Sequence, residues 1–195
     1  MSASAISSHP APVLADLVPG ARVRDVALTL AGTAFITVAG YLTVPLPFTP
    51  VPISLATFAV LLTGAALGPV RGGASAFLYL ALGLVGVPLF AHGNAGWAFS
   101  SFGYIIGYVV AALIVGSLAR HRADRSVLTT LGLAALGSLA IYACGVPWLA
   151  VFLGVDLVTA IGLGVVPFLI GDAVKIVAMS ALLPGTWRLV DRTRP

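Results

Sequence analysis

Charged residues are scarce in this sequence. Only 8% of its 195 residues are Asp, Glu, Lys or Arg, with one lysine and no glutamate, whereas 59% are hydrophobic. Soluble globular domains carry about 25% charged residues, so this composition excludes an ordinary soluble domain. A helix needs about 20 predominantly apolar residues to cross a bilayer. The chain therefore predicts an all-α integral membrane protein with about six transmembrane helices.

Residues for redox, metal and nucleotide chemistry are also few. The single cysteine, Cys144, can form no disulfide within the chain. The three histidines, His9, His92 and His121, follow no zinc-binding spacing. The only lysine follows Val174, whereas a nucleotide-binding P-loop places its lysine after a glycine. We therefore expect no metal, no cofactor, no enzymatic activity and no ATP hydrolysis by the chain itself.

Long apolar runs alternate with short polar connections. Residues 1–21, rich in Ser, Pro and Ala, are expected to form a flexible cytoplasmic tail, and residues 22–195 a single transmembrane domain. Four prolines in residues 45–52 predict a stiff loop, residues 88–101 irregular backbone, and residues 157–165 a short surface helix. The predicted spans are residues 26–44, 53–67, 72–87, 102–119, 127–153 and 167–183.

The nine arginines predict how the chain lies in the membrane. In a six-span topology they all fall in connections on one side, and the opposite connections contain neither Lys nor Arg. Because Lys and Arg are retained on the cytoplasmic side, both termini are expected in the cytoplasm. The net charge of +4 is thus divided among membrane connections and does not indicate a nucleic-acid-binding face.

Two ionisable residues remain inside an apolar span, Asp172 and Lys175. Each costs roughly 2.5–3.5 kcal/mol at the centre of a membrane helix, and such groups are candidates for function by default. Their spacing of three places them on one helical face. A carboxylate beside an ammonium can receive a ligand that presents both N–H donors and a carbonyl acceptor. The alternative is a structural ion pair that only neutralises itself.

Other residues could complete a ligand site. Asn94 lies in a glycine-rich stretch, where an asparagine either forms a turn or contacts ligand. Aromatic side chains could cover a flat apolar ligand, although Trp97 and Trp148 also suit an interfacial belt. The aromatic candidates are these two tryptophans with Phe48, Tyr79, Tyr104, Tyr108 and Tyr142.

Small residues recur near the start of the first span. Ala27 and Ala31 are four residues apart, with Gly32 beside them, a pattern that lets another helix approach closely. The pattern is compatible with a partner helix and equally with packing inside the bundle.

Several ordered segments carry a family resemblance. They are residues 47–54 (PFTPVPIS), 64–68 (GAALG), 79–91 (YLALGLVGVPLFA) and 167–175 (PFLIGDAVK), together with Gly103-Tyr104, Gly107, Tyr142 and Gly145. This set resembles the BioY family of biotin transporters, which supply substrate-binding S components of energy-coupling factor (ECF) transporters. The likeness covers nearly the whole chain after Ala21. One departure is Ser100-Ser101-Phe102, where the family often has Gly-Pro-Thr.

The resemblance implies the six-helix fold of ECF S components and a binding site for biotin. It implies that Asp172 and Lys175 help bind the fused-ring head of biotin, with Asn94 as a weaker candidate, and that the chain lies in the bacterial inner membrane. Tyr142, one of the aromatic candidates, is also expected to bind substrate. The resemblance also implies that the loop 45–52, with Phe48 and Thr49, closes over the site.

A partner surface and partners are implied as well. By the same resemblance, Ala27 and Ala31 face a transmembrane coupling subunit, which acts with two ATPase subunits. Some members of the family are thought to work without these partners, so the energy source stays open at this point.

The sequence thus predicts capture and uptake of biotin, with Asp172 as acceptor and Lys175 as donor. One alternative is an S component for another vitamin, such as thiamine or riboflavin. Another is a self-sufficient proton-coupled vitamin carrier that uses Asp172 as its proton site. An intramembrane enzyme is disfavoured, because no nucleophile and base stand in matched positions.

Overall fold

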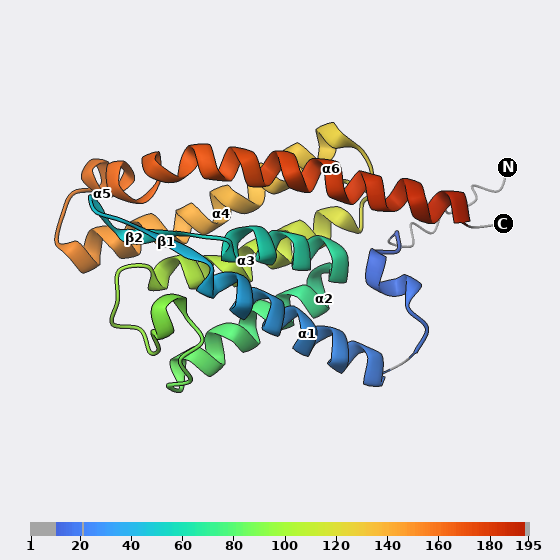
Figure 1. Cartoon of the computed structure of the whole chain (residues 1–195), viewed down its shortest axis with the longest axis horizontal. Helices are drawn as coiled ribbons and strands as arrows, with labels where there is room; N and C mark the ends of the chain where they lie inside the picture. The colour runs from blue at the N-terminus through green and yellow to red at the C-terminus, as the bar shows by residue number, and fades with distance from the viewer. Residues whose placement is uncertain (1–10, 21, 194–195) are drawn as a thin grey trace, which may run out of the picture.

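The computed structural model describes residues 11–20 and 22–193 and is mostly helical (Figure 1). The helices are α1 (Arg22–Tyr41), α2 (Ala56–Leu84), α3 (Phe102–Ala119), α4 (Val127–Leu153), α5 (Leu157–Gly164) and α6 (Leu169–Thr193). Short 3-10 helices are η1 (Leu14–Leu17), η2 (Ala91–Gly93) and η3 (Val166–Phe168), and two strands are β1 (Thr43–Leu46) and β2 (Thr49–Ser54).

Five stretches within the described residues are long and apolar enough to cross a membrane. They comprise α1, α2, α3, α4 and the run from Leu157 to Arg192 that includes α5 and α6. The chain is therefore a multi-pass membrane protein. The count differs from the six predicted spans because the predicted spans 53–67 and 72–87 both lie in α2.

Helix α2 is folded back on itself at Gly68. This glycine has φ 81° and ψ 177°, a backbone conformation that residues with a Cβ atom rarely adopt, and Pro69 follows it. A Cβ atom on Gly72 would lie 2.8 Å from the Cα of Gly64, although the two glycines are eight positions apart in the sequence. The two halves of α2 therefore pack directly against each other, and Figure 1 shows them running in opposite directions.

Glycines also allow the neighbouring helices to approach closely. A Cβ atom on Gly64 would lie 2.9 Å from the carbonyl oxygen of Ala112 in α3. On the other side of α3, a Cβ atom on Gly107 would lie 2.7 Å from the Cα of Ile141 in α4. Small residues at such crossings bring backbones together where lipid supplies no hydrophobic drive for association. Helix α3 is thus held between α2 and α4.

The proline-rich segment, predicted as a stiff loop, is a β-hairpin. Strands β1 and β2 pair antiparallel, with Thr43 opposite Ser54, Val44 opposite Ile53 and an irregularity before Leu46. A two-stranded ribbon has only edge strands, and prolines are tolerated there because an edge residue can lack a ladder hydrogen bond. The hairpin shortens the flanking helices, so α1 ends at Tyr41 and α2 begins at Ala56.

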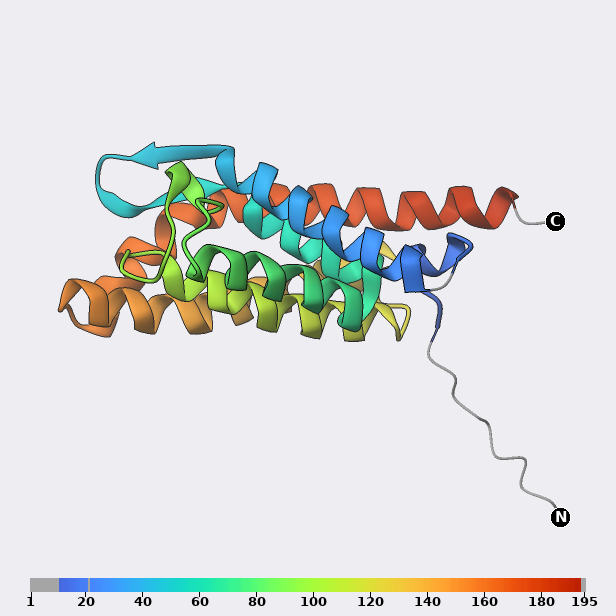
Figure 2. The ribbon, with the colours of Figure 1, turned by 90° about the horizontal axis from the view of Figure 1, so that it is seen from below.

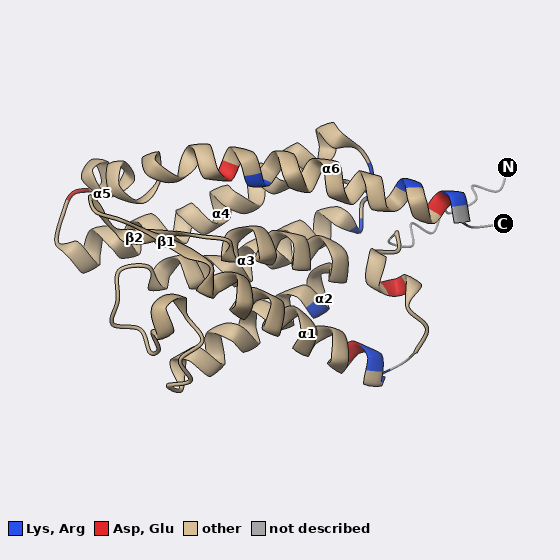
Figure 3. Ribbon diagram, viewed as in Figure 1, with Lys and Arg blue, Asp and Glu red and all other residues tan. Residues whose placement is uncertain are grey.

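The two ends of the bundle differ in structure and charge. The β-hairpin, the α2–α3 connection and α5 lie at one end, and both described ends of the chain lie at the other (Figures 1 and 2). Figure 3 shows the basic residues gathered at the end that carries the termini, apart from the basic residue midway along α6, which is Lys175. The opposite end carries Asp156, which caps α5.

Residues 11–20, part of the expected flexible tail, pack against the charged end of the bundle. Val13 is fully buried, and Asp16 forms ion pairs with Arg71 at 2.5 Å and Arg120 at 2.7 Å. Burial alone would raise the pKa of the Asp16 carboxyl, but its bonds to Arg71 and Val13 and the charge of Arg120 hold that pKa below its usual value. Residues 1–10 and 21 of the expected tail lie outside the described residues.

The sixth predicted span ends too early. Helix α6 continues past Leu183 and through Pro184 to Thr193. Its last turns are anchored by Trp187, which is buried, donates its indole N–H to Asp124 and lies under the guanidinium of Arg125. Burial raises the pKa of Asp124, against the opposing effects of Trp187 and Arg125. These contacts offset the loss of the helical hydrogen bond that Pro184 cannot form.

The close approach within α2 generates a stability prediction. Gly72→Ala would force a Cβ atom against the backbone of Gly64, so we expect it to destabilise the protein by about 1–3 kcal/mol, the usual range for overpacking. Gly132→Ala in α4 is the matched control, since a Cβ there meets nothing within 4 Å. Thermal unfolding in detergent measures both. Equal melting temperatures for the two variants would contradict the fold-back.

Candidate functional site

A cavity opens among the helices toward the end that carries the β-hairpin. Its volume is about 700 Å³, counting the part that is open to solvent. Its walls come from α1, β2, α2, α3, α4, η3 and α6 and from the α2–α3 connection. The polar side chains and tyrosines in the lining are Thr57, Tyr79, Ser101, Tyr104, Tyr108, Ser138, Tyr142, Asp172 and Lys175, and Ser54 contributes as well.

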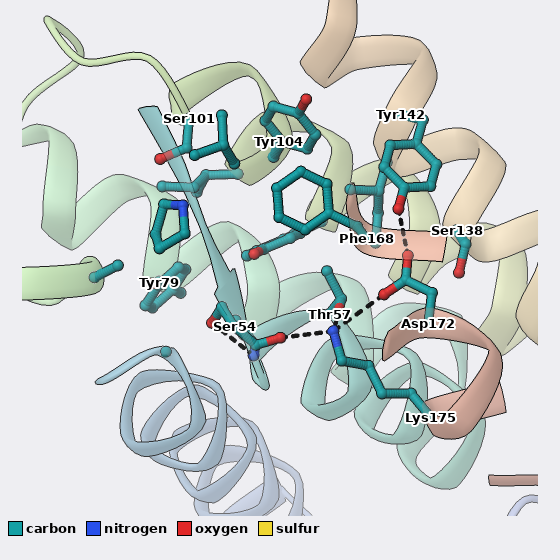
Figure 4. Close-up of a pocket in the computed structure, with 18 of the residues that line it drawn as sticks. Ser54, Thr57, Tyr79, Ser101, Tyr104, Ser138, Tyr142, Phe168, Asp172 and Lys175 are labelled. Carbon is teal, nitrogen blue, oxygen red and sulfur yellow. Dashed lines mark hydrogen bonds and ion pairs between the residues drawn. The ribbon is translucent and has the colours of Figure 1, made fainter. Parts of the chain in front are cut away.

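Lys175 is held by three hydrogen bonds from three parts of the chain (Figure 4). Its Nζ donates to the carbonyl oxygen of Ser54 at 2.7 Å and to the Oγ1 of Thr57 at 2.9 Å. The third bond runs to Oδ1 of Asp172 at 3.0 Å. An ammonium group has three donors, so all of its capacity is used within the protein.

Asp172 stands at the centre of the polar group. Its Oδ1 accepts from Lys175, and its Oδ2 accepts the hydroxyl proton of Tyr142 from α4. Only 11% of the Asp172 side chain and 12% of the Lys175 side chain are exposed. A carboxylate offers about four lone-pair positions, so Asp172 can accept further N–H donors from a ligand.

Aromatic rings form much of the rest of the wall. Tyr79 and Tyr108 stack with their centroids 6.3 Å apart, and Tyr104 meets Tyr142 edge to face at the same separation. Figure 4 shows Phe168 in the middle of the cavity, between Tyr104 and the Asp172–Lys175 pair. Much apolar wall with a few converging polar groups is typical of sites for small organic ligands.

The structure brings together three of the four predicted substrate-binding residues. Asp172, Lys175 and Tyr142 line the cavity and bond to one another, as their interactions above show. Asn94 does not line it. This residue lies on the wall of a second, neighbouring pocket.

The two predicted gating residues lie at the hairpin turn, outside the main cavity. Phe48 is 61% exposed, whereas Thr49 is buried and lines the second pocket. The Oγ1 of Thr49 donates to the carbonyl oxygen of Leu163 at 2.8 Å, which ties the hairpin to α5. Their role in gating stays a prediction.

The predicted partner residues lie on the outer face of α1. Ala27 and Ala31 are exposed, whereas Gly32 is buried where an added Cβ would meet Ser75 and Thr63. Gly32 therefore serves packing inside the bundle, and the two alanines leave a surface on which another helix could lie.

Some lining residues had no sequence signal. The Ser54 carbonyl is a backbone group, and Thr57, Ser138 and Phe168 reach the cavity from separate elements. Phe168 follows Pro167 in one of the motif segments, which is the single clue that could have marked it. Of the predicted aromatic residues, Trp97 and Trp148 pack against each other and do not line the cavity.

Comparisons with known proteins agree with this geometry. The model of the BioY family matches residues 9–192. A probable biotin transporter BioY of Pyrococcus horikoshii is 37% identical over 157 residues, which cover 79% of this chain and 90% of that protein. The biotin transporter BioY of Thermotoga maritima is 33% identical over 153 residues, covering 77% of this chain and 88% of the relative.

A solved structure is similar as well. The crystal structure of an S-component for biotin from an ECF-type ABC transporter superposes with a TM-score of 0.77 and 27% identity. The match covers 86% of this chain and 92% of that one.

The cluster of Asp172, Lys175 and Tyr142 leads to a prediction about the binding of biotin, the ligand implied by the sequence. Asp172→Asn and Lys175→Met should each weaken binding by about tenfold to a hundredfold, because each removes a charge-assisted hydrogen bond. Tyr142→Phe keeps the ring and loses only the hydroxyl, so its effect should be smaller. Titration calorimetry measures all three variants.

The matched control is Asp191→Asn, which makes the same change on the exposed end of α6, outside the cavity. It should bind as the unaltered protein does, and circular dichroism should show helical content unchanged in all variants. Unaltered binding by both Asp172→Asn and Lys175→Met would remove the pair from the site.

Proposed function

This chain belongs to the BioY family, and on that premise we propose that it captures biotin and mediates its uptake as the substrate-specific subunit of an ECF-type transporter. Since its relatives are biotin transporters, it is a transport protein rather than an enzyme. The observation that carries the proposal is the cluster of Asp172, Lys175 and Tyr142 on the wall of a cavity that is also lined by several aromatic rings.

The chemistry of biotin's head suits this group. Its ureido ring presents N–H donors and a strongly polar carbonyl acceptor on a compact bicyclic body. The carboxylate of Asp172 accepts the N–H groups, and the ammonium of Lys175 donates to the carbonyl. Hydrogen bonds with one charged partner are shorter and about twice as strong as neutral ones. The rings of Tyr79, Tyr108 and Phe168 cover the apolar part of the ligand.

The β-hairpin is the gate in this proposal. Lys175 donates to the carbonyl oxygen of Ser54, at the end of β2, so a ligand that competes for this ammonium acts on the hairpin directly. The hairpin turn carries Phe48, which is exposed, and Thr49, which holds the turn to α5. Closing of residues 45–52 over bound biotin would exclude water from the Asp172–Lys175 pair.

We propose that the chain crosses the membrane six times, with each half of α2 counted as one pass. The fold-back at Gly68 and the gathering of arginines at one end support this count, because Arg71 then lies beside the other basic connections. Both termini would lie in the cytoplasm, and the cavity would open to the outside.

Release of biotin into the cell requires work that this chain does not supply. We propose that a transmembrane coupling subunit and two ATPase subunits provide it, with the coupling subunit lying against Ala27 and Ala31 on α1. Biotin is the cargo, and the binding step needs no cofactor. A self-sufficient carrier would instead move a proton on Asp172, and vesicles without any ATPase distinguish the two when a pH gradient alone is imposed.

The first test of function is a calorimetric titration of the detergent-solubilised protein with biotin, then with thiamine and riboflavin. We expect binding of one biotin per chain and no heat from the other two vitamins, since neither presents a ureido ring to Asp172 and Lys175. Heat with thiamine or riboflavin and none with biotin would keep the fold and overturn the substrate.

The proposed orientation is tested by cysteine labelling. In a Cys144→Ser background, Phe48→Cys at the hairpin turn should react with a membrane-impermeant maleimide added to intact cells. Arg192→Cys, exposed near the other end of the bundle, should react only after the membrane is permeabilised. The reverse pattern would invert the topology.

A further inference from the structure

A second pocket adjoins the main cavity on its outer side. It has a volume of about 430 Å³, again counting its open part. The β-hairpin forms one wall, and the connection between α2 and α3 forms the other. Pro52, Ala91, Phe99 and Ser101 line both spaces, so a ligand in the main cavity can extend past them into the second pocket.

The second pocket carries polar groups that the protein does not use. His92 and Asn94 are exposed on its wall, and neither side chain forms a hydrogen bond or ion pair with another residue that the structure describes. By contrast, the hydroxyl groups of Thr49 and Ser100 donate to backbone carbonyls nearby. No acidic side chain is among the lining residues. The wall therefore offers hydrogen-bond donors to an anion without a neighbouring carboxylate to repel it.

His92 is held in an unusual backbone conformation. Its φ of 59° and ψ of 22° lie in the left-handed region, which a residue with a side chain seldom adopts, and Gly93 follows with φ 74°. Such conformations persist where the surrounding structure holds them, often at ligand sites. Here the conformation places a histidine at the mouth of the pocket.

A ligand with a polar ring head and an acid tail could lie in the two connected spaces in either of two orientations. If the acid met Lys175, its carboxylate would lie beside the carboxylate of Asp172, whose Oδ1 is 3.0 Å from the Lys175 Nζ, and the two like charges would repel each other. If the ring head met Lys175 and Asp172, the tail would run toward Ser101, which Figure 4 shows on the far side of Phe168 from Lys175. The second orientation keeps the acid away from Asp172 and brings it to the pocket that His92 lines.

We propose that the second pocket receives the carboxylate tail of the ligand and that His92 selects for this carboxylate, with Asn94 as a neutral donor beside it. This inference rests on the proposed function and adds the orientation of biotin and the residue that distinguishes the acid from its neutral derivatives. Of the residues lining the two spaces, Lys175 and His92 can carry positive charge, and Lys175 lines the main cavity whereas His92 lines the second pocket.

The test compares two ligands, biotin and biotin methyl ester, which share the ring head and differ in the charge of the tail. For the unaltered protein we expect the dissociation constant of the ester to exceed that of biotin by about tenfold or more, as for loss of a charge-assisted hydrogen bond. In His92→Gly this ratio should fall toward one, while the affinity for the ester stays the same. Glycine is chosen because it adopts the left-handed backbone without strain.

Two further variants complete the experiment. His92→Asn keeps a hydrogen-bond donor and tolerates the left-handed backbone, so part of the preference for the acid should remain. Val85→Ala is the control, since this valine is 78% exposed at the end of α2 and lines neither space. It should leave the ratio unchanged.

The outcomes separate this inference from the proposed function. Binding of biotin with the same ester-to-acid ratio in His92→Gly as in the unaltered protein would overturn the role of His92 alone. A preference for the acid that vanishes in Lys175→Met and persists in His92→Gly would reverse the orientation of the ligand. Failure of the unaltered protein to bind either compound would overturn the proposed function, and this inference with it.

Discussion

The cost of keeping two opposite charges inside an apolar bundle governs the arrangement of this protein. An ammonium and a carboxylate at membrane depth are stable only when their hydrogen-bonding capacity is met. Lys175 and Asp172 meet it by drawing together the end of β2, the start of α2 and the middle of α4. The contacts that satisfy the pair therefore also hold β2, α2 and α4 around the cavity, and the bond from Lys175 to Ser54 attaches the hairpin to α6.

Close packing elsewhere makes this arrangement possible. The fold-back at Gly68 divides α2 into two short helices, and the glycines of these helices let α3 and its neighbours approach to backbone contact. Short helices leave irregular backbone near the membrane, in the hairpin and in the connection between α2 and α3. Such backbone is tolerated where protein or a water-filled cavity covers it. These two segments form the walls of the second pocket and part of the wall of the main cavity.

The two ends of the bundle serve different needs. At the end with the termini, Asp16 joins the N-terminal segment to Arg71 and Arg120, and Trp187 joins α6 to the turn between α3 and α4. At the other end, the hairpin is held by hydrogen bonds from Thr49 to α5, from Ser100 to the Pro50 carbonyl and from Lys175 to the Ser54 carbonyl. Ion pairs and the buried Trp187 thus join the segments at the end with the termini, whereas hydrogen bonds join them at the hairpin end.

The sequence by itself determined the membrane class, most of the helices and the Asp172–Lys175 pair, because hydropathy and helical spacing act locally. The family followed from the resemblance of its ordered motif segments. The sequence also indicated a site rich in tyrosine. Only the tertiary structure decided that the Ser54 carbonyl and Thr57 complete the bonding of Lys175, that Asn94 lies in a separate pocket, and that residues 45–52 form a hairpin. It also decided that α6 runs on to Thr193. These features depend on contacts between segments far apart in the chain, such as Trp187 with Asp124, and no local pattern reports which distant groups will meet.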